Sequence, residues 1–283
     1  MFGFINIYKP KGKTSHDIVA ILRRITKVKQ IGHTGTLDPF AEGVLPICIG
    51  KATRLIEYLD DDKAYIGTVQ FGTATDTYDL EGKVVKTSEK KVKKDDVEKV
   101  LKIFEGEIEQ KPPIYSALKV KGKKLYEYAR KGEEVEIKSR KVEISEIKLL
   151  NFDEKNQNAE IYIACSKGTY IRSIANDMGE FLGVYGHLIK LVRVKAGGFC
   201  LEKSVKLEDL TINNVENNLV NPLEYLNYPK YEVNEFEKEK ISHGSSIKIN
   251  DFNNQLVILM SNKKILAIGN VENKEFKCSK VFV

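Results

Sequence analysis

The hydrophobic pattern of this chain changes once, near residues 211–230, and this change limits the folds available to it. Before that stretch, short alternating segments typical of strands are interspersed with segments whose apolar residues repeat at helical spacing. After it, only short strand-like pieces remain, separated by asparagine and glycine turns: SSIKI, QLVILMS, KKILAIG and KVFV. We therefore expect one large unit over residues 1–226 and a small all-β unit, a barrel, over residues 230–283.

The large unit shows no regular alternation of strand, helix and strand, which favours an α+β fold with a mixed central sheet and flanking helices. The patterns predict strands at 3–8, 64–72 and 160–166, and helices at 16–28, 51–60, from Asp95 or Asp96 to about 104, and after 166. Ser15 is expected to cap the first helix. The glycines and prolines of residues 31–50 indicate an ordered loop with short strand pieces.

Several classes of protein are disfavoured by what the chain contains. No apolar run has the length of a signal-peptide core or a membrane span, so we expect a soluble, cytoplasmic protein. The 4 cysteines lack a C-x-x-C pair and mostly have apolar neighbours, as buried free thiols do. The 4 histidines are scattered, and we predict no metal site.

Positive charge is concentrated in residues 119–141, KVKGKKLYEYARKGEEVEIKSRK, which carry nine Lys and Arg against four Glu. Cations with interleaved tyrosines suit a nucleic acid, because cations displace phosphate counterions and aromatic faces stack on bases. A solvated surface segment has the same composition. Charge alone leaves both interpretations open.

The segment with the most chemical content is GHTGTLDPFAEGVL at residues 32–45. Its glycines permit close approach of the backbone, and Pro39 holds Asp38 in an extended conformation. A rigidly held, isolated carboxylate in such a loop is one way to present a nucleophile. An ordinary Asp-Pro turn has the same local sequence.

These fourteen residues resemble the G-H-x-G-x-L-D-P-x-A-x-G-x-L signature of the TruB-type pseudouridine synthases. Further segments resemble that family in the expected order, so that the resemblance extends from residue 3 to about 210: NIYKPKGKTS at 6–15, AYIGTVQFGTATDTYDLEG at 64–82, QKPPIYSALKVKGKKLYEYARKG at 110–132, and CSKGTYIRSIANDMGE at 165–180.

The resemblance implies three catalytic residues, which are Asp38 as nucleophile, Tyr65 stacked on the target base, and Arg172 paired with the aspartate. It also implies substrate contacts by Tyr65 and four others: His33, Tyr170, Leu191 and Lys9. Without it, Tyr65 would be taken for a core residue and Arg172 for surface charge. The reaction moves one base from an N1 to a C5 glycosidic link, so no cofactor is expected.

The resemblance further implies an RNA-gripping insertion at about 112–141 and a PUA-like C-terminal barrel that touches the acceptor stem of tRNA. The implied function is isomerisation of the uridine at position 55 in the T-arm, by a monomer acting without guide RNA. A guide-RNA-dependent synthase of the dyskerin kind shares the G-H-x-G-T-L-D-P segment but lacks the long insertion. A non-catalytic RNA-binding protein or RNA chaperone is the alternative from another class.

Overall fold

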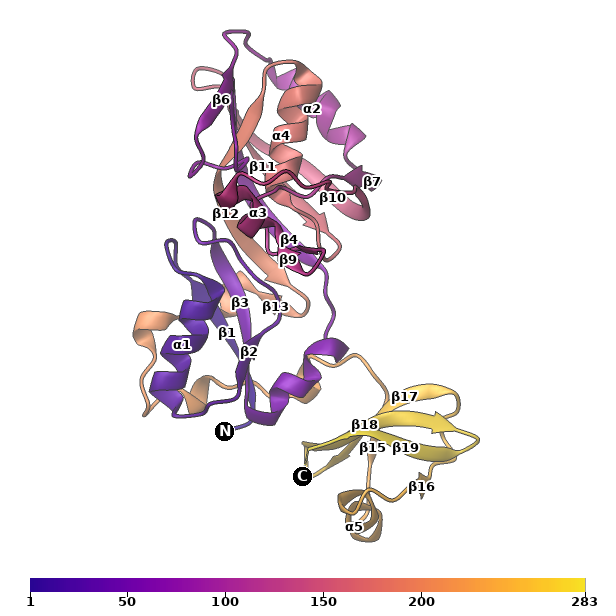
Figure 1. Ribbon diagram of the computed structural model, residues 1–283. Coiled ribbons are helices and arrows are strands. Elements are labelled where there is room, and N and C mark those ends of the chain that lie inside the picture. The colour runs from indigo at the N-terminus through magenta and orange to yellow at the C-terminus, as the bar shows by residue number, and fades with distance from the viewer. Residues whose placement is uncertain (283) are drawn as a thin grey trace.

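Two β-sheets dominate the structure, a computed structural model that describes residues 1–282 (Figure 1). The main sheet has the strand order β14-β1-β3-β12-β4-β11-β10-β7, with β2 paired to β3 and β13 to β12. Its strands are β1 (Gly3–Lys9), β2 (Ile31–His33), β3 (Glu42–Ile49), β4 (Lys63–Phe71), β7 (Gly106–Gln110), β10 (Arg140–Asp153), β11 (Asn158–Cys165), β12 (Gly186–Ala196), β13 (Phe199–Cys200) and β14 (Val205–Lys206).

The main sheet is mixed, as the sequence predicts. Strand β1 pairs in parallel with β14, and β3 in parallel with β12, whereas the remaining ladders are antiparallel. The expected strands are present as β1, β4 and β11. The long strands β10 and β12 were not anticipated, although β12 lies at the centre of the sheet between β3 and β4.

Helices cover the main sheet in two places. Helices α2 and α4 share one buried cluster with strands β4, β10, β11 and β12, while α1 packs on a second cluster formed with β1, β2 and β3. The helices and minor elements of this part are α1 (Ser15–Thr26), the 3-10 helix η1 (Gly50–Tyr58), α2 (Lys94–Ile103), α3 (Leu125–Lys131), α4 (Ile171–Leu182), and the hairpins β5 (Thr73–Thr75) with β6 (Val84–Thr87) and β8 (Lys119–Val120) with β9 (Lys123–Lys124).

Three expectations about helices need correction. Thr14 caps α1, because its hydroxyl accepts from Asp17 N while Asp17 accepts from Thr14 N; Ser15 instead turns inward and bonds to Leu37. Helix α2 begins at Lys94, with Asp96 inside its first turn accepting from Lys93 N. The helix expected at 51–60 is a 3-10 helix.

The second sheet has five strands in the order β15-β17-β18-β19-β16 and forms the small β unit that the sequence predicts. It curls around its own apolar cluster and is covered by α5, a helix that the sequence analysis did not anticipate (Figure 1). Its elements are β15 (Lys230–Glu232), α5 (Glu235–Ser242), β16 (Ile247–Lys248), β17 (Gln255–Ser261), β18 (Lys264–Glu272) and β19 (Glu275–Val281), reached through the short 3-10 helices η2 (Leu201–Lys203), η3 (Leu207–Asp209), η4 (Glu216–Asn218) and η5 (Pro222–Glu224).

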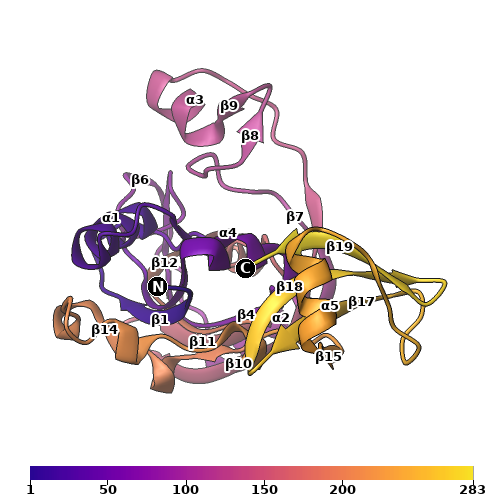
Figure 2. The same cartoon turned by 90° about the horizontal axis from the view of Figure 1, so that it is seen from below.

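The two sheets are joined by a shared apolar cluster. Phe4 and Phe199 from the main sheet belong to the same buried cluster as Ile258 and Ile268 from the second sheet and Phe282, which follows β19. The two chain ends lie close together in both ribbon views (Figures 1 and 2), and the rings of Phe2 and Phe282 are 6.0 Å apart. The small sheet therefore has its own core and also rests on the large unit.

The cysteines are all free, with Cys48 and Cys165 buried and Cys200 and Cys278 half-buried. Over residues 1–282, no helix combines the length and apolar character that crossing a membrane requires.

Candidate active site

A cavity of about 450 Å³ lies where the 34–38 loop, strand β4, the N-terminus of α4 and the start of the insertion meet. Three stretches of the chain form most of its wall: residues 34–38, 116–118 and 167–172. The middle one, Ser116, Ala117 and Leu118, belongs to the insertion and closes one side. The residues around it are Thr34, Gly35, Thr36, Leu37, Asp38, Lys63, Tyr65, Ser116, Ala117, Leu118, Lys167, Gly168, Thr169, Tyr170, Ile171, Arg172 and Leu191. Five residues singled out from the sequence are thus brought together: Asp38, Tyr65, Tyr170, Arg172 and Leu191.

The floor of this cavity holds one arginine between two carboxylates. Arg172 Nε lies 2.9 Å from an oxygen of Asp38, as an ion pair rather than an aligned hydrogen bond, and Nη1 lies 3.2 Å from Asp79. The remaining donors reach the carbonyls of Thr77, at 3.1 Å, and Tyr115, at 3.0 Å. With the Arg172 side chain only 5% exposed, its direction is fixed from four sides.

Two opposing influences act on the pKa of the Asp38 carboxylate. Burial raises its pKa, and the negative charge of Asp79 adds to this rise, while the guanidinium of Arg172 and the ammonium of Lys9 oppose it. About 33% of the Asp38 side chain is exposed, and it faces the cavity. A ligand in the cavity can therefore reach this carboxylate directly.

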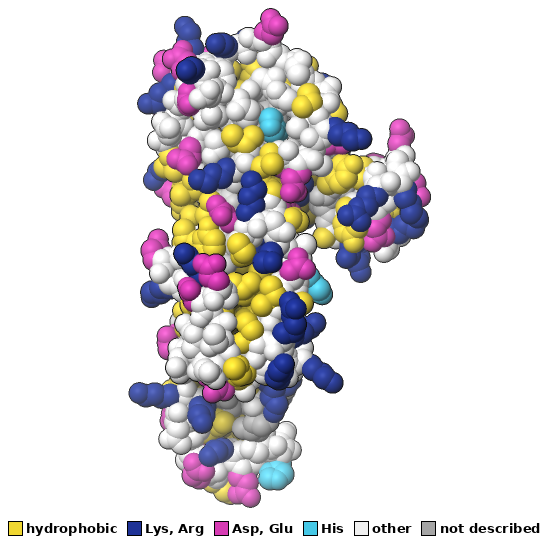
Figure 3. All heavy atoms as spheres, turned by 90° about the vertical axis from the view of Figure 1, so that its left-hand side faces the viewer, with side chains coloured by type: hydrophobic (Ala, Val, Ile, Leu, Met, Phe, Trp, Pro, Cys, Tyr) yellow, Lys and Arg dark blue, Asp and Glu magenta, His cyan; other side chains and the backbone are white. Residues whose placement is uncertain are grey.

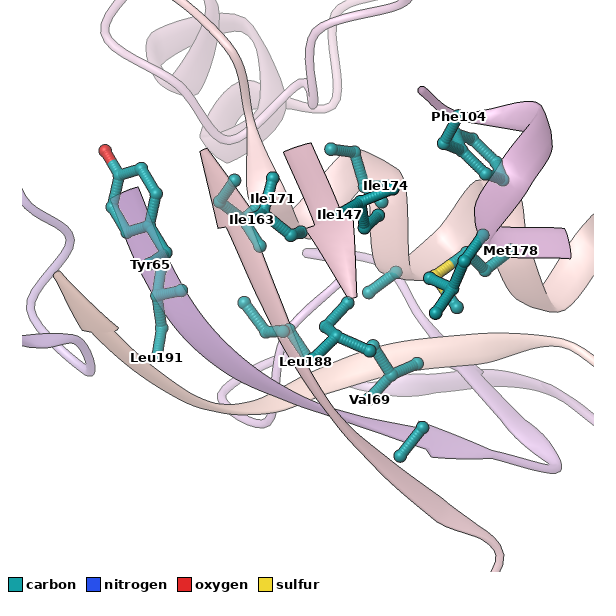
Figure 4. Packing of buried hydrophobic residues seen from close by; sticks show 14 of the residues in the cluster. Tyr65, Val69, Phe104, Ile147, Ile163, Ile171, Ile174, Met178, Leu188 and Leu191 are labelled. Carbon is teal, nitrogen blue, oxygen red and sulfur yellow. The ribbon is translucent and has the colours of Figure 1, made fainter. Parts of the chain in front are cut away.

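Tyr65 and Leu191 form an apolar wall beside Asp38. Both are buried members of the main-sheet cluster, with Tyr65 at 7% exposure. Figure 4 shows Tyr65 at the edge of that cluster, with Leu191 beneath it and its hydroxyl directed away from the apolar side chains. Burial raises the pKa of the Tyr65 hydroxyl, which remains protonated at neutral pH. The wall thus combines a flat ring with one polar atom.

Tyr170 is fixed by residues from both ends of the insertion. The Gln110 amide donates to Tyr170 O at 3.0 Å and accepts from Tyr170 N at 2.7 Å. The guanidinium of Arg140 lies 5.0 Å from the centre of the Tyr170 ring. Gln110 and Arg140 are direct neighbours in the β7–β10 ladder, so the insertion begins and ends against this side of the cavity.

Lys9 and His33 are near the cavity but do not line it. Lys9 is fully buried, and its ammonium donates to the carbonyls of Pro10, Lys13 and Pro39. Burial lowers the pKa of Lys9 to about 8. His33 directly precedes Thr34 of the cavity rim, and its buried Nδ1 has no hydrogen-bond partner among residues 1–282. Lys9 thus supports the turn that carries Asp38.

Two buried charged residues of the site were missed by the sequence analysis, Asp79 and Arg193. Asp79 lies in the stretch TDTYDLEG, whose composition is that of a solvated turn, yet it is only 4% exposed. Arg193 is fully buried within the apolar run LVRV of β12. A charge inside such a run is the one signal that could have indicated it.

The arrangement provides an ion-paired carboxylate, an aromatic wall and a cavity of the size of a small cyclic ligand. Among residues 1–282, no group of three or more His, Cys, Asp or Glu side chains is placed to hold a metal ion.

Comparison with known proteins assigns the family. Residues 23–171 match the family model of the TruB family pseudouridylate synthase (N terminal domain), and residues 172–226 match that of the tRNA pseudouridylate synthase B C-terminal domain. The chain is 43% identical over 286 residues to the tRNA pseudouridine synthase B of Caldanaerobacter subterraneus subsp. tengcongensis, with 99% of each chain covered. It is 41% identical to the tRNA pseudouridine synthase B of Clostridium perfringens, with 100% of this chain and 99% of the relative covered.

Among solved structures, a chain from a Cbf5-Nop10-Gar1 complex superposes with a TM-score of 0.71 at 26% identity, covering 100% of this chain and 85% of that chain. This similarity confirms the expected α+β class. Taken with the matches over nearly the full length, it shows that the chain belongs to the TruB family of pseudouridylate synthases and is an isomerase that acts on tRNA.

Proposed function

We propose that the chain converts the uridine at position 55 in the T-arm of tRNA to pseudouridine, with Asp38 as nucleophile and without guide RNA. The observation that carries this proposal is the Asp38–Arg172 ion pair of 2.9 Å on the floor of a cavity walled by Tyr65. A carboxylate that must attack carbon needs to be ionised, and a fixed guanidinium favours the ionised form.

The chemistry requires the target base to leave the RNA stack and enter the cavity. The N1–C1′ bond breaks, the base turns, and a C5–C1′ bond forms; C5 then loses its proton and N1 gains one. No atom is added and no electron is transferred. Attack by Asp38 on the sugar carbon and attack on the base both need the same ionised carboxylate beside the base.

The remaining site residues have supporting roles in this proposal. The ring of Tyr65 stacks on the base, and its hydroxyl is placed to take part in proton transfer. Tyr170 and Leu191 limit the depth and width of the cavity. His33, with its unpartnered Nδ1 beside the rim, contacts nucleotides next to the target. Lys9 acts by fixing the Asp38–Pro39 turn through Pro39 O.

The substitution Asp38→Asn tests the nucleophile. It preserves shape and hydrogen-bonding capacity, so we expect tRNA affinity within about threefold of wild type, because the amide retains the contacts of the side chain. No pseudouridine should form, even with enzyme in excess over tRNA, since an amide cannot replace the attacking carboxylate. The measurement is nucleoside analysis after long incubation, alongside a binding curve.

The matched control is Asp62→Asn, which removes a carboxylate that pairs with Lys195 outside the cavity wall. This variant should react as fast as wild type. Turnover by a sequence-verified Asp38→Asn protein, free of deamidated material, would refute the assignment of the nucleophile.

Independence from guide RNA is supported by the insertion, which is present here and absent from the dyskerin kind of synthase. The higher identity to tRNA pseudouridine synthase B relatives, 43% against 26% for the Cbf5 chain, points the same way. Purified protein should therefore modify an unmodified tRNA transcript without any added RNA or protein. A requirement for a second component would contradict this part of the proposal.

We also propose that residues 1–226 form the catalytic unit and residues 230–283 an RNA-binding unit that touches the acceptor stem. In support, exposed lysines surround the hairpin turns of the small sheet: Lys263, Lys264, Lys274 and Lys277. The enzyme is proposed to act as a monomer. A tRNA-modifying enzyme of this kind is expected to act in the cytoplasm.

A further inference from the structure

Arg193 is a fully buried arginine that lies next to the cavity without lining it. Its Nε donates to Val44 O at 2.7 Å, Nη1 to Thr36 O at 3.3 Å, and Nη2 to Gly35 O at 3.1 Å. These three carbonyls belong to the two ends of the loop that carries Asp38. We refer to this set of contacts as the carbonyl cage.

The strand pairing places Arg193 between this loop and Tyr65. In β12, Arg193 is paired with Gly43 of β3 on one side and with Tyr65 of β4 on the other. Gly43 has a φ of +106°, and a Cβ atom there would lie 2.3 Å from Arg193 O. Only glycine permits this approach, which holds β12 against the start of β3, where the Asp38 loop ends.

The charge of Arg193 also acts on Tyr65, where it opposes the rise that burial causes in the pKa of the Tyr65 hydroxyl. A guanidinium has donors and no acceptor, so it can interact with this hydroxyl only through the oxygen. One cation thus holds the Asp38 loop by three hydrogen bonds and acts electrostatically on Tyr65.

No carboxylate among residues 1–282 forms an ion pair with Arg193, and backbone carbonyls are its principal partners. Desolvating a cation without a counter-charge is costly, so its presence calls for a reason beyond filling space. Methionine or leucine would fill the same space in an apolar strand. The planar fork of arginine, with donors in fixed directions, can hold these three carbonyls at once, whereas the single ammonium of lysine cannot.

We propose that Arg193 is a positioning residue for pseudouridine formation, which fixes the Asp38 loop and the Tyr65 hydroxyl in register with each other. This inference rests on the proposed roles of Asp38 and Tyr65. It adds to the site a buried cation behind the cavity wall, whose function is geometric and which does not touch the RNA.

The primary test is Arg193→Lys, measured as the single-turnover rate with enzyme in saturating excess over tRNA. We expect a rate about 100-fold below wild type, because displacement of a reacting group by about 1 Å has an effect of that order. The dissociation constant for tRNA should stay within about threefold, since Arg193 lies behind the cavity wall. This separation of rate from affinity would not arise from a general loss of folded protein.

The matched control is Arg23→Lys. Arg23 also donates to backbone carbonyls, those of Lys29 at 2.9 Å and Ile31 at 3.4 Å, but it lies on α1 outside the cavity wall. It should leave the single-turnover rate unchanged. A folded Arg193→Lys protein whose rate is within tenfold of wild type would overturn the inference.

A double-mutant cycle separates the effect of Arg193 on the Asp38 loop from its effect on the Tyr65 hydroxyl. Tyr65→Phe removes the hydroxyl and leaves the ring, so the effect of Arg193→Lys should be smaller in that background than in wild type. Strict additivity of the two substitutions would show that Arg193 does not act through the Tyr65 hydroxyl. If wild-type protein forms no pseudouridine on tRNA, the proposed function fails instead, and the two failures are thereby distinguishable.

Should Arg193→Lys not fold, the unchanged protein still tests the cage by 15N NMR of its guanidinium groups. Arg172 and Arg193 are the arginines buried among residues 1–282, so two slowly exchanging sets of signals are expected. Arg172→Lys should remove one set and leave the set from Arg193. Observation of a single set in wild type, lost in Arg172→Lys, would overturn the carbonyl cage.

Discussion

The floor of the cavity and the insertion that closes it handle charge in opposite ways. On the floor and directly behind the cavity wall, Arg172 and Arg193 are buried, and nearly every donor has a fixed acceptor at a defined distance. In the insertion, most cations are exposed, and Figure 2 shows α3, β8 and β9 standing away from the main sheet. Figure 3 shows Lys and Arg side chains gathered on this projecting lobe.

Function is concentrated in single residues on the floor and distributed over many residues in the insertion. A buried charge acts through geometry, so a single substitution on the floor should abolish rate while leaving binding intact. An exposed lysine acts through the long-range field of many charges, so each one contributes little and its effect is screened by salt. The aromatic rings of the insertion are themselves covered by cations: Lys124 and Arg130 lie 5.4 and 5.3 Å from the Tyr126 ring.

The largest effect is expected from Arg172→Ala. The substitution leaves Asp38 and Asp79 as neighbouring carboxylates without the cation between them. Loss of one preorganised electrostatic partner typically slows an enzyme by about 100- to 1,000-fold, and we expect a loss of at least that order in the single-turnover rate. Affinity for tRNA should change little. The control Lys167→Ala removes an exposed cation from the cavity rim and should have a small effect. Comparable losses for the two variants would break the contrast between floor and surface.

A smaller effect on rate, with a definite effect on pH dependence, is expected from Asp79→Asn. The charge of Asp79 raises the pKa of Asp38, so its removal should lower that pKa. Because the reaction needs ionised Asp38, the rate falls as pH drops through this pKa, and the acid limb should move to lower pH in the variant. The plateau should drop by about 10-fold or more, since Arg172 loses one of its anchors. A pH profile with an unmoved acid limb would contradict the coupling between the two carboxylates.

The residues that line the cavity could be predicted from the sequence. The buried residues that fix their positions could not. Asp38, Tyr65 and Arg172 were identified through resemblance, and the structure brings them together around one cavity. Asp79 and Arg193 were missed, because a buried carboxylate in a polar turn has no local signature and the only local sign of Arg193 is a charge inside an apolar run. The partners that bring them into the site are distant in sequence and are brought close only by the folded chain: Arg172 for Asp79, and the backbone carbonyls of Gly35, Thr36 and Val44 for Arg193.

For the fold, too, the sequence predicted the regular elements and missed the irregular ones. Strands with regular alternation, such as β4 and β11, were recognised, whereas β10 and β12 were not. Both missed strands contain register shifts, between Ile144 and Glu146 in β10 and between Leu188 and Lys190 in β12. A bulge inverts the alternation of side chains, so the period-two signal is lost part-way along the strand. The short polar helix α5 buries only Ile241 and has almost no amphipathic pattern to detect.

A moderate effect is expected from removing residues 230–283. The main sheet keeps its own two clusters, so the shortened chain should fold. It should be less stable than the full chain, because Phe4 and Phe199 lose the packing of Ile258, Ile268 and Phe282. We expect about 10-fold weaker binding to whole tRNA and a smaller loss on an isolated T-arm hairpin, since only whole tRNA has an acceptor stem. Near-UV circular dichroism checks the fold, and equal losses on both RNAs would argue against an acceptor-stem contact.

The smallest effect per residue is expected from the cations of the insertion. It should appear in the salt dependence of tRNA binding. Lys119 and Lys121 are exposed and form no ion pair with residues 1–282, whereas Lys123 is 3.8 Å from Glu133 and is partly neutralised. Replacing Lys119 and Lys121 by Gln should weaken tRNA binding a few-fold and reduce the slope of log K against log salt by about 0.7 to 0.9 per lysine.

Lys99→Gln with Lys102→Gln removes the same charge from α2, where the cations lie away from the insertion (Figure 2), and should alter the slope less. Single-turnover rates at saturation should be wild-type in both variants, because neither pair touches the floor. If the two double variants change the slope equally, binding depends on net charge rather than on the insertion. If the insertion variant instead slows the saturated rate, the cations above the cavity also act on its geometry, through the contact of Arg172 with Tyr115 O.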